Sequence, residues 1–338
     1  MKQIKWLDYT RGAAIILVVL GHAIAGVSVE AGSFFNIMYM IITGFHMPLF
    51  FLISGFLYNQ KNKENTLNCY FSDFEKKVID LLIPYVLFEV LYCVVGYFTK
   101  DEKYTFEALI RSYYHPISHF WFIYVLFFVF MIIPIVLFIV RKEWIAVFVF
   151  LTVYMLIAGI EIEFPIVSIV YYSIFFLLGK AAAQAGIFTK KICHPIAFVF
   201  LLIVYLVYNY FRASYDVLNF RGLNILNAII GMYVFVVGMV FLMNTLKVCQ
   251  SFFCKLGKAS ILIYLVHSLF VSISRTLLIK ASISFSPLII ILTTIIGTVI
   301  PLLIYLLGER FALISIFYMP RKSFIRIRHK EKREASQT

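Results

Sequence analysis

Residues 119–140 read HFWFIYVLFFVFMIIPIVLFIV and contain no Asp, Glu, Lys or Arg. A helix of about 20 apolar residues crosses the roughly 30 Å hydrocarbon core of a bilayer. Lipid offers no hydrogen-bond partner to exposed backbone groups, so a stretch of this kind must be helical there. Residues 119–140 therefore predict a transmembrane helix.

Similar apolar stretches recur along the chain. Hydrophobic residues make up 62% of the 338 residues and charged residues 14%, whereas soluble domains are about 45–50% apolar and about 25% charged. We expect spans near 12–29, 34–58, 78–98, 119–140, 143–160, 166–183, 195–210, 226–243, 259–279 and 286–306. The sequence therefore predicts an all-α polytopic membrane protein with about ten transmembrane helices.

The basic residues predict the orientation, because Lys and Arg gather in cytoplasmic loops. With the N terminus inside, 22 of the 30 Lys and Arg residues fall in inner segments and six in outer loops, while Arg11 and Arg275 lie inside spans. Both termini are then cytoplasmic. Residues 1–310 form the transmembrane domain, and residues 311–338 form a basic cytoplasmic tail that we expect to lie along anionic headgroups of the membrane lipids.

Other classes of site find little support. The net charge of +13 follows from topology, and without a basic domain or binding motif it does not indicate a nucleic-acid partner. The five cysteines contain no CxxC pair, so we expect neither a disulfide framework nor a metal site. The sequence does not indicate an oligomeric state.

Ionisable residues inside spans are costly and are therefore functional candidates. In the first span, Arg11 and His22 are eleven residues apart, about three helical turns, so they share one face about 16 Å apart. Asp8 is spaced to pair with Arg11. The alternative is a snorkelling Arg and a histidine that is hydrogen-bonded to a neighbouring helix.

The second span carries His46 near mid-depth, followed by Pro48. Proline frees a backbone carbonyl one turn earlier and can bend the helix, and broken membrane helices usually line cavities. The alternative is a packing kink with a hydrogen-bonded histidine. We expect His267, in the ninth span, to be an ordinary core histidine.

The third and fourth spans add further polar candidates. Lys76 and Lys77 stand at the inner start of the third span, and Glu89 is a mid-span carboxylate that can orient a histidine or neutralise a cation. His119 and Trp121 lie at the outer interface, where an aromatic belt is ordinary. Together they can instead bind a sugar through ring stacking and a hydrogen bond.

Several blocks of sequence carry a family resemblance. They are Trp6-Leu-Asp8-Tyr-Thr-Arg11-Gly12 through Gly21-His22, His46-Met-Pro48-Leu-Phe-Phe-Leu-Ile-Ser54-Gly55, Pro84-Tyr85, His119-Phe-Trp121-Phe122 and Tyr264-Leu-Val-His267. The chain resembles the acyltransferase-3 family of membrane acyltransferases, and within it the sugar O-acetyltransferases. The resemblance implies that an acyl group moves from cytoplasmic acyl-CoA to a hydroxyl, and that Arg11 and His22 are essential.

One position departs from the family pattern. Relatives often carry Arg-x-x-Arg at the inner start of the third helix, where this chain reads Lys77-Val-Ile-Asp80. We expect the phosphates of the coenzyme to lie near Arg11, Lys76 and Lys77. Acetyl-CoA would be a co-substrate, with no bound cofactor.

The expected reaction is general-base acyl transfer in a bacterial inner membrane. His22 takes the proton of the acceptor hydroxyl, which suits an imidazole near neutral pH. His46 donates to the oxyanion, orients His22 or acts as a second base, and a covalent acyl-histidine stays open. Ser54 and Tyr58 are further candidates for oxyanion donors.

The expected acceptor is a lipid-linked sugar or nascent surface glycan. It would enter from the outer side past His119 and Trp121, with Glu89 and Ser54 as further substrate-binding residues.

Three other functions would fit parts of the pattern. A polysaccharide or small-molecule transporter or flippase would show inverted repeats or paired broken helices, and we see neither. A glycosyltransferase that uses lipid-linked sugars would need acidic residues in its first outer loop, which offers only Glu30. A haem protein would use two of His22, His46 and His267 as axial ligands.

Overall fold

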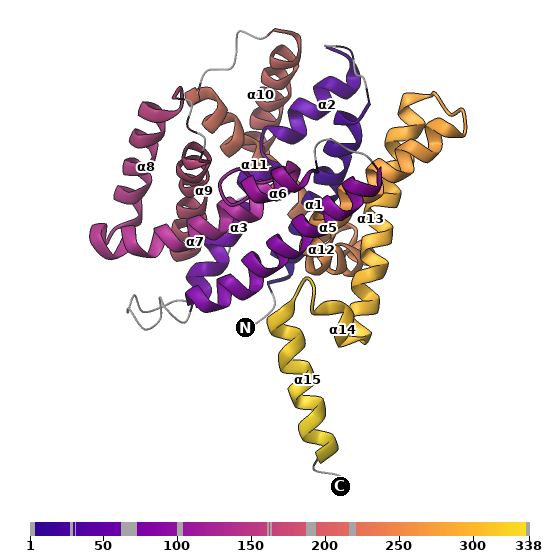
Figure 1. The fold of residues 1–338 in the computed structure, drawn as a ribbon. Helices are drawn as coiled ribbons and strands as arrows, with labels where there is room; N and C mark the ends of the chain where they lie inside the picture. The colour runs from indigo at the N-terminus through magenta and orange to yellow at the C-terminus, as the bar shows by residue number, and fades with distance from the viewer. Residues whose placement is uncertain are drawn as a thin grey trace. The chain divides into compact units, whose positions relative to one another are not determined.

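The computed structural model describes residues 4–27, 30, 32–61, 73–99, 104–160, 162, 164–186, 194–215 and 221–335, and within these ranges it contains helices and no strand (Figure 1). The longer helices are α1 (Lys5–Ala25), α2 (Phe34–Thr43), α3 (His46–Lys61), α5 (Ile83–Thr99), α7 (Trp121–Val140), α8 (Glu143–Ile157), α9 (Ile166–Gln184), α10 (Pro195–Ser214), α11 (Arg221–Thr245), α12 (Lys247–Lys280), α13 (Ser286–Arg310) and α15 (Pro320–Ala335). The short ones are the π-helix η1 (Val78–Leu82), α6 (Phe106–Arg111), the 3-10 helix η2 (Ser118–Phe120) and α14 (Ala312–Ser315). The prediction of an all-α polytopic membrane protein is confirmed.

Each of the ten expected spans corresponds to a helical segment. Among the described residues, nine segments are long and apolar enough to cross a membrane, with α2 and α3 counted as one segment. The remaining segment, expected at 143–160, forms α8 with 15 residues, a rise of about 22 Å that falls short of a typical span. Helix α8 packs beside α9 (Figure 1) and exposes Trp144, Phe148 and Leu156.

The chain divides into two compact units. Unit 1 comprises residues 1–50 and 187–305, and unit 2 comprises residues 51–186 and 306–338. The division falls within α3 and α13.

Unit 1 is built around the close pair of α1 and α12. A Cβ at Gly12 would overlap the carbonyl oxygen of Phe253, and a Cβ at Gly257 would overlap the carbonyl oxygen of Asp8. Glycine at both positions lets the two backbones touch, which is how small residues promote helix packing in membranes. The two helices run parallel, since contacts advance from Arg11 with Ser260 to His22 with His267.

The second span of unit 1 breaks between α2 and α3, as Pro48 predicts. Gly44 and Phe45 form a turn, and Pro48 lies in the first turn of α3, where its missing N–H is tolerated. Neighbouring side chains bind the carbonyls near the break: the Tyr205 hydroxyl donates to Ile41 O at 2.6 Å. Broken membrane helices need such replacement donors.

Unit 2 contains a second close helix pair, formed by the part of α3 from Phe51 onward and by α9. A Cβ at Gly55 would overlap the carbonyl of Phe176, and one at Gly179 would overlap the carbonyl of Leu52. An ion pair of 2.6 Å between Glu143 Oε1 and Lys180 Nζ ties α8 to α9. These contacts fix the framework on which the polar residues of unit 2 stand.

Candidate active site

Three histidines from three helices meet in unit 1. The rings of His22 on α1 and His267 on α12 contact edge to face, with centroids 4.8 Å apart and an interplanar angle of 63°. His46, the first residue of α3, lies near His22. Within the described residues these imidazoles do not form a metal-binding group.

Backbone carbonyls fix the tautomers of two of these rings. His46 Nδ1 lies 2.8 Å from Ile42 O, and His267 Nδ1 lies 2.8 Å from Tyr264 O. Because a carbonyl only accepts, Nδ1 must carry the proton, and the neutral ring then keeps its lone pair on Nε2. Both rings are therefore oriented acceptors at Nε2.

The side chains of the three histidines differ in their exposure to solvent. His267 is fully buried at 0% exposure, whereas His22 and His46 are partly exposed. The side chains of His22 and His46 are thus less enclosed than that of His267.

Arg11 and His22 both contact α12. Its Nη2 donates to Ser260 Oγ at 2.9 Å, and Ser260 lies seven residues, about two turns, before His267 on α12. Since both Arg11 and His22 contact α12, they share one face of α1, as their spacing predicts.

At the end of unit 2 that we predict to be extracellular, Glu89 supports a loop. The carboxylate is fully buried, and its Oε1 accepts from Ile117 N at 3.0 Å. The Tyr85 hydroxyl donates to Ser112 O at 2.7 Å, and Ser118 adopts a left-handed φ of 52°. Glu89 thus holds the loop before α7 in place, and a ligand cannot reach it without moving this loop.

The predicted sugar-binding residues of unit 2 differ in their surroundings. His119 is 4% exposed and packs between Tyr92 and Phe120, with ring centroids 5.4 and 4.3 Å away. Trp121 is partly exposed and stacks on Tyr172 at 5.3 Å. Ser54 on α3 is also partly exposed.

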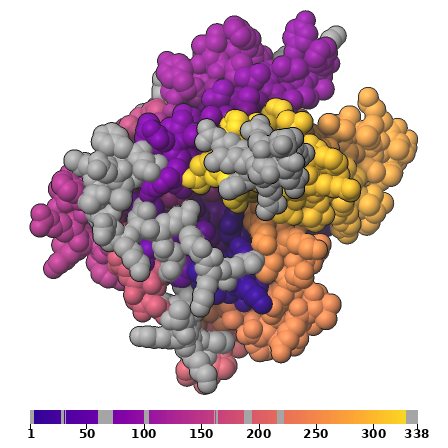
Figure 2. Space-filling view, turned by 90° about the horizontal axis from the view of Figure 1, so that it is seen from below, coloured from indigo at the N-terminus to yellow at the C-terminus, as the bar shows by residue number. Residues whose placement is uncertain are grey.

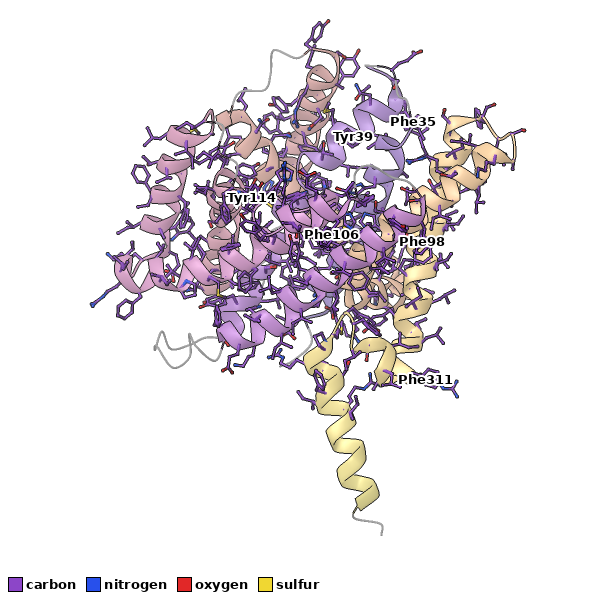
Figure 3. All side chains as sticks on the ribbon, in the orientation of Figure 1. Phe35, Tyr39, Phe98, Phe106, Tyr114 and Phe311 are labelled. Carbon is purple, nitrogen blue, oxygen red and sulfur yellow. The ribbon has the colours of Figure 1, made fainter. Side chains whose placement is uncertain are left out.

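A pocket of about 530 Å³ opens beside this loop. Phe106, which follows the lining residue Thr105, has a ring that is 75% exposed (Figure 3). Sequence reasoning missed the pocket, although the block His115-Pro-Ile-Ser-His119 pointed to this region. The pocket is lined by Thr105, Glu107, Ala108, Arg111, His115, Pro116, Ile117 and Ser118.

The inner start of the third span, also in unit 2, gathers cations. Lys76 Nζ pairs with Asp73 Oδ1 at 3.1 Å, and Lys77 Nζ sits 3.3 Å from the centroid of the Phe130 ring, within the range of a cation–π contact. The structure therefore places the predicted phosphate-binding lysines in unit 2 and Arg11 in unit 1.

Comparison with known protein families shows which family the chain belongs to. A family model described as an acyltransferase domain, Acyl_transf_3, matches residues 4–306 of the 338. The chain belongs to the acyltransferase-3 family. No curated protein and no solved structure matches it.

This acyltransferase therefore holds Arg11, His22 and His46 within unit 1. His267 was expected to be an ordinary core histidine, and it does bind backbone carbonyls, but it also contacts His22. The contact joins two residues that are 245 positions apart in the sequence, so no local pattern indicated it. Unit 2 holds the other candidates: Ser54, Lys76, Lys77, Glu89, His119 and Trp121.

Proposed function

We propose that this membrane acyltransferase moves an acetyl group from cytoplasmic acetyl-CoA to a hydroxyl of a cell-surface glycan, such as an O-antigen or exopolysaccharide sugar. The bacterial inner membrane is the proposed location. The observation that carries the proposal is the histidine cluster: His22 is partly exposed and lies beside two histidines, His46 and His267, whose tautomers are fixed by backbone carbonyls.

His22 is the proposed general base. The acceptor O–H gives its proton to an imidazole nitrogen, and the oxygen attacks the thioester carbonyl. The tetrahedral intermediate collapses, the C–S bond breaks, and the CoA sulfur takes the proton back from the imidazolium. The acetyl ester and free CoA are the products, so atoms and charge balance.

His46 orients His22 in this scheme. Its Nδ1–H binds Ile42 O, so its neutral ring offers a lone pair at Nε2 and has no second proton to donate to an oxyanion. It can accept an N–H from His22, which leaves the other nitrogen of His22 to act as base. The oxyanion donors belong elsewhere, and Ser54 is the proposed candidate.

The two substrates use polar groups at opposite ends of the spans. Arg11, Lys76 and Lys77 bind the phosphates of acetyl-CoA, since charge-assisted hydrogen bonds from cations suit phosphate. The glycan binds at the outer end of unit 2, where Trp121 offers a ring and the loop pocket offers Arg111 and His115. Glu89 and His119 act by holding this loop.

The test uses the purified protein in lipid nanodiscs with radiolabelled acetyl-CoA and a lipid-linked glycan from the native envelope. We expect release of free CoA and labelled glycan. His22→Gln should lower kcat by about 10²–10⁴-fold, the range of general-base catalysis. His46→Gln should lower it less, and the double variant should match His22→Gln, because residues that act as a unit are not additive.

His194→Gln is the matched control, since His194 is exposed at the start of α10. It should retain wild-type activity. The reasoning is wrong if His22→Gln turns over like the wild type. Uptake or flipping of glycan without consumption of acetyl-CoA would favour a transporter instead.

A further inference from the structure

The C-terminal segment lies outside the matched acyltransferase domain, yet it is built into unit 2. Residues 307–338 follow the matched range 4–306. The Ser315 and Ser323 hydroxyls meet at 2.7 Å, and both side chains are buried. Tyr318 is 2% exposed, and burial, with the Glu309 carboxylate adding to the effect, raises the pKa of its phenol to about 12. The segment therefore has a defined packing arrangement.

One ion pair joins α15 to the inner start of the third span. Arg321 Nη2 lies 2.7 Å from Asp80 Oδ2, with 33% of the Arg321 side chain and 31% of the Asp80 side chain exposed. Asp80 lies in η1, and π-helical turns of this kind are frequent at functional sites. Figure 2 shows the yellow C-terminal segment beside the purple segment that contains η1, and α15 packs against η1.

The pair places a guanidinium on the carboxylate of Asp80, three residues after Lys77 in the chain. Lys76 is paired with Asp73, Lys77 rests on the Phe130 ring, and Arg321 is paired with Asp80. Each cation is fixed by a partner, so little side-chain freedom is lost when an anion binds. Arg321 uses one donor for Asp80, and a guanidinium has five, so its exposed part can still bind phosphate oxygens.

We infer that Arg321 is a phosphate-binding residue of the acyl-CoA site, and that Asp80 is the positioning residue that holds it there. The inference rests on the proposed function, because it assumes that the donor is an acyl-CoA. It gives the C-terminal segment a role in donor binding and explains why an acid stands at position 80.

The test compares two acyl donors that differ in their phosphates. Arg321→Gln should raise KM about tenfold for acetyl-CoA, the effect of one charge-assisted hydrogen bond, and leave KM unchanged for acetyl-pantetheine, which has no phosphate. Lys322→Gln removes the neighbouring charge of the same helix and should change neither value. If loss of Arg321 merely disturbs the fold, KM will rise equally for acetyl-CoA and acetyl-pantetheine. That result overturns the inference.

A charge swap guards against a folding defect. Asp80→Arg with Arg321→Asp keeps the ion pair and returns a guanidinium to the same place, so KM for acetyl-CoA should stay within about threefold of the wild type. Asp80→Asn should raise KM, and adding it to Arg321→Gln should raise KM no further. An additive effect in that double variant contradicts the positioning role of Asp80.

Direct titration of CoA into the nanodisc-embedded protein separates this inference from the proposed function. If the wild type binds CoA and Arg321→Gln binds it equally well, the inference fails and the proposed function stands. If the wild type neither binds CoA nor transfers acetyl groups, both fail. About tenfold weaker binding of CoA by Arg321→Gln supports the inference.

Discussion

The close contact between α1 and α12 makes a sharp prediction about two glycines of one helix. A Cβ at Gly12 would overlap the backbone carbonyl of Phe253, whereas the nearest atom to a Cβ at Gly21 is Ile42 Cγ2 at 3.7 Å, an ordinary contact. Gly12→Ala should therefore destabilise the protein, and Gly21→Ala should leave it as stable as the wild type or slightly more stable. The two variants make the same chemical change in the same helix.

The comparison isolates the packing cost. Replacing glycine by alanine inside a helix gains roughly 0.5–1 kcal/mol of helix propensity at either site, so this gain cancels between the variants. Overpacking a tight contact costs about 1–3 kcal/mol. Gly12→Ala should thus lie about 1–3 kcal/mol below Gly21→Ala in free energy of unfolding. Separating α1 from α12 also weakens the bond from Arg11 to Ser260.

The measurement is reversible unfolding in mixed detergent micelles, followed by circular dichroism. Gly257→Ala should lower the free energy of unfolding by a similar amount. The double variant with Gly12→Ala should lower it by less than the sum of the two single losses, because the first methyl group already separates α1 from α12 and makes room for the second. Equal stability of Gly12→Ala and Gly21→Ala would refute the close helix contact. Full additivity of the two glycine variants would show that they disturb different contacts.

Three further contacts can be tested in the same unfolding assay. Tyr205→Phe removes the donor to a carbonyl at the helix break and should cost about 1–3 kcal/mol, whereas Tyr210→Phe, exposed on the same helix, should cost almost nothing. Lys180→Met removes the cation from a largely buried ion pair and should lower the free energy of unfolding by up to about 3–5 kcal/mol. Adding Glu143→Gln should restore most of this stability, and a failure to restore it would argue against the ion pair. Glu89→Leu should cost about 1–3 kcal/mol because the loop loses its acceptor, while Glu89→Gln, which keeps an acceptor oxygen, should cost less; equal losses would show that the oxygen does not matter.

Hydropathy predicted most spans but placed several helix starts too late, two of them by about two turns or more. The first span was expected from residue 12 and the ninth from residue 259, whereas α1 begins at Lys5 and α12 at Lys247. The missing turns contain polar and charged residues, which a hydropathy pattern excludes. They are helical because α1 and α12 pack against each other there through Gly12 and Gly257, a contact invisible to any local pattern.

The sequence predicted one spatial relation between the candidate side chains but not which helices neighbour them. The spacing of Arg11 and His22 placed both on one face of α1, because helix geometry alone determines that relation. It gave no sign that this face meets α12, since every membrane helix is apolar and hydropathy does not select partners. For the same reason, the burial of Glu89 and His119 behind a loop was not foreseen.

The break in the second span links a sequence feature to the proposed chemistry. Helix α2 ends at Thr43 and α3 begins at His46, so carbonyls at the end of α2 need donors from side chains. His46 supplies one of them through Nδ1 to Ile42 O. That bond orients the ring and leaves its lone pair on Nε2. The break that Pro48 predicts therefore lies beside the acceptor that, in the proposed mechanism, positions His22.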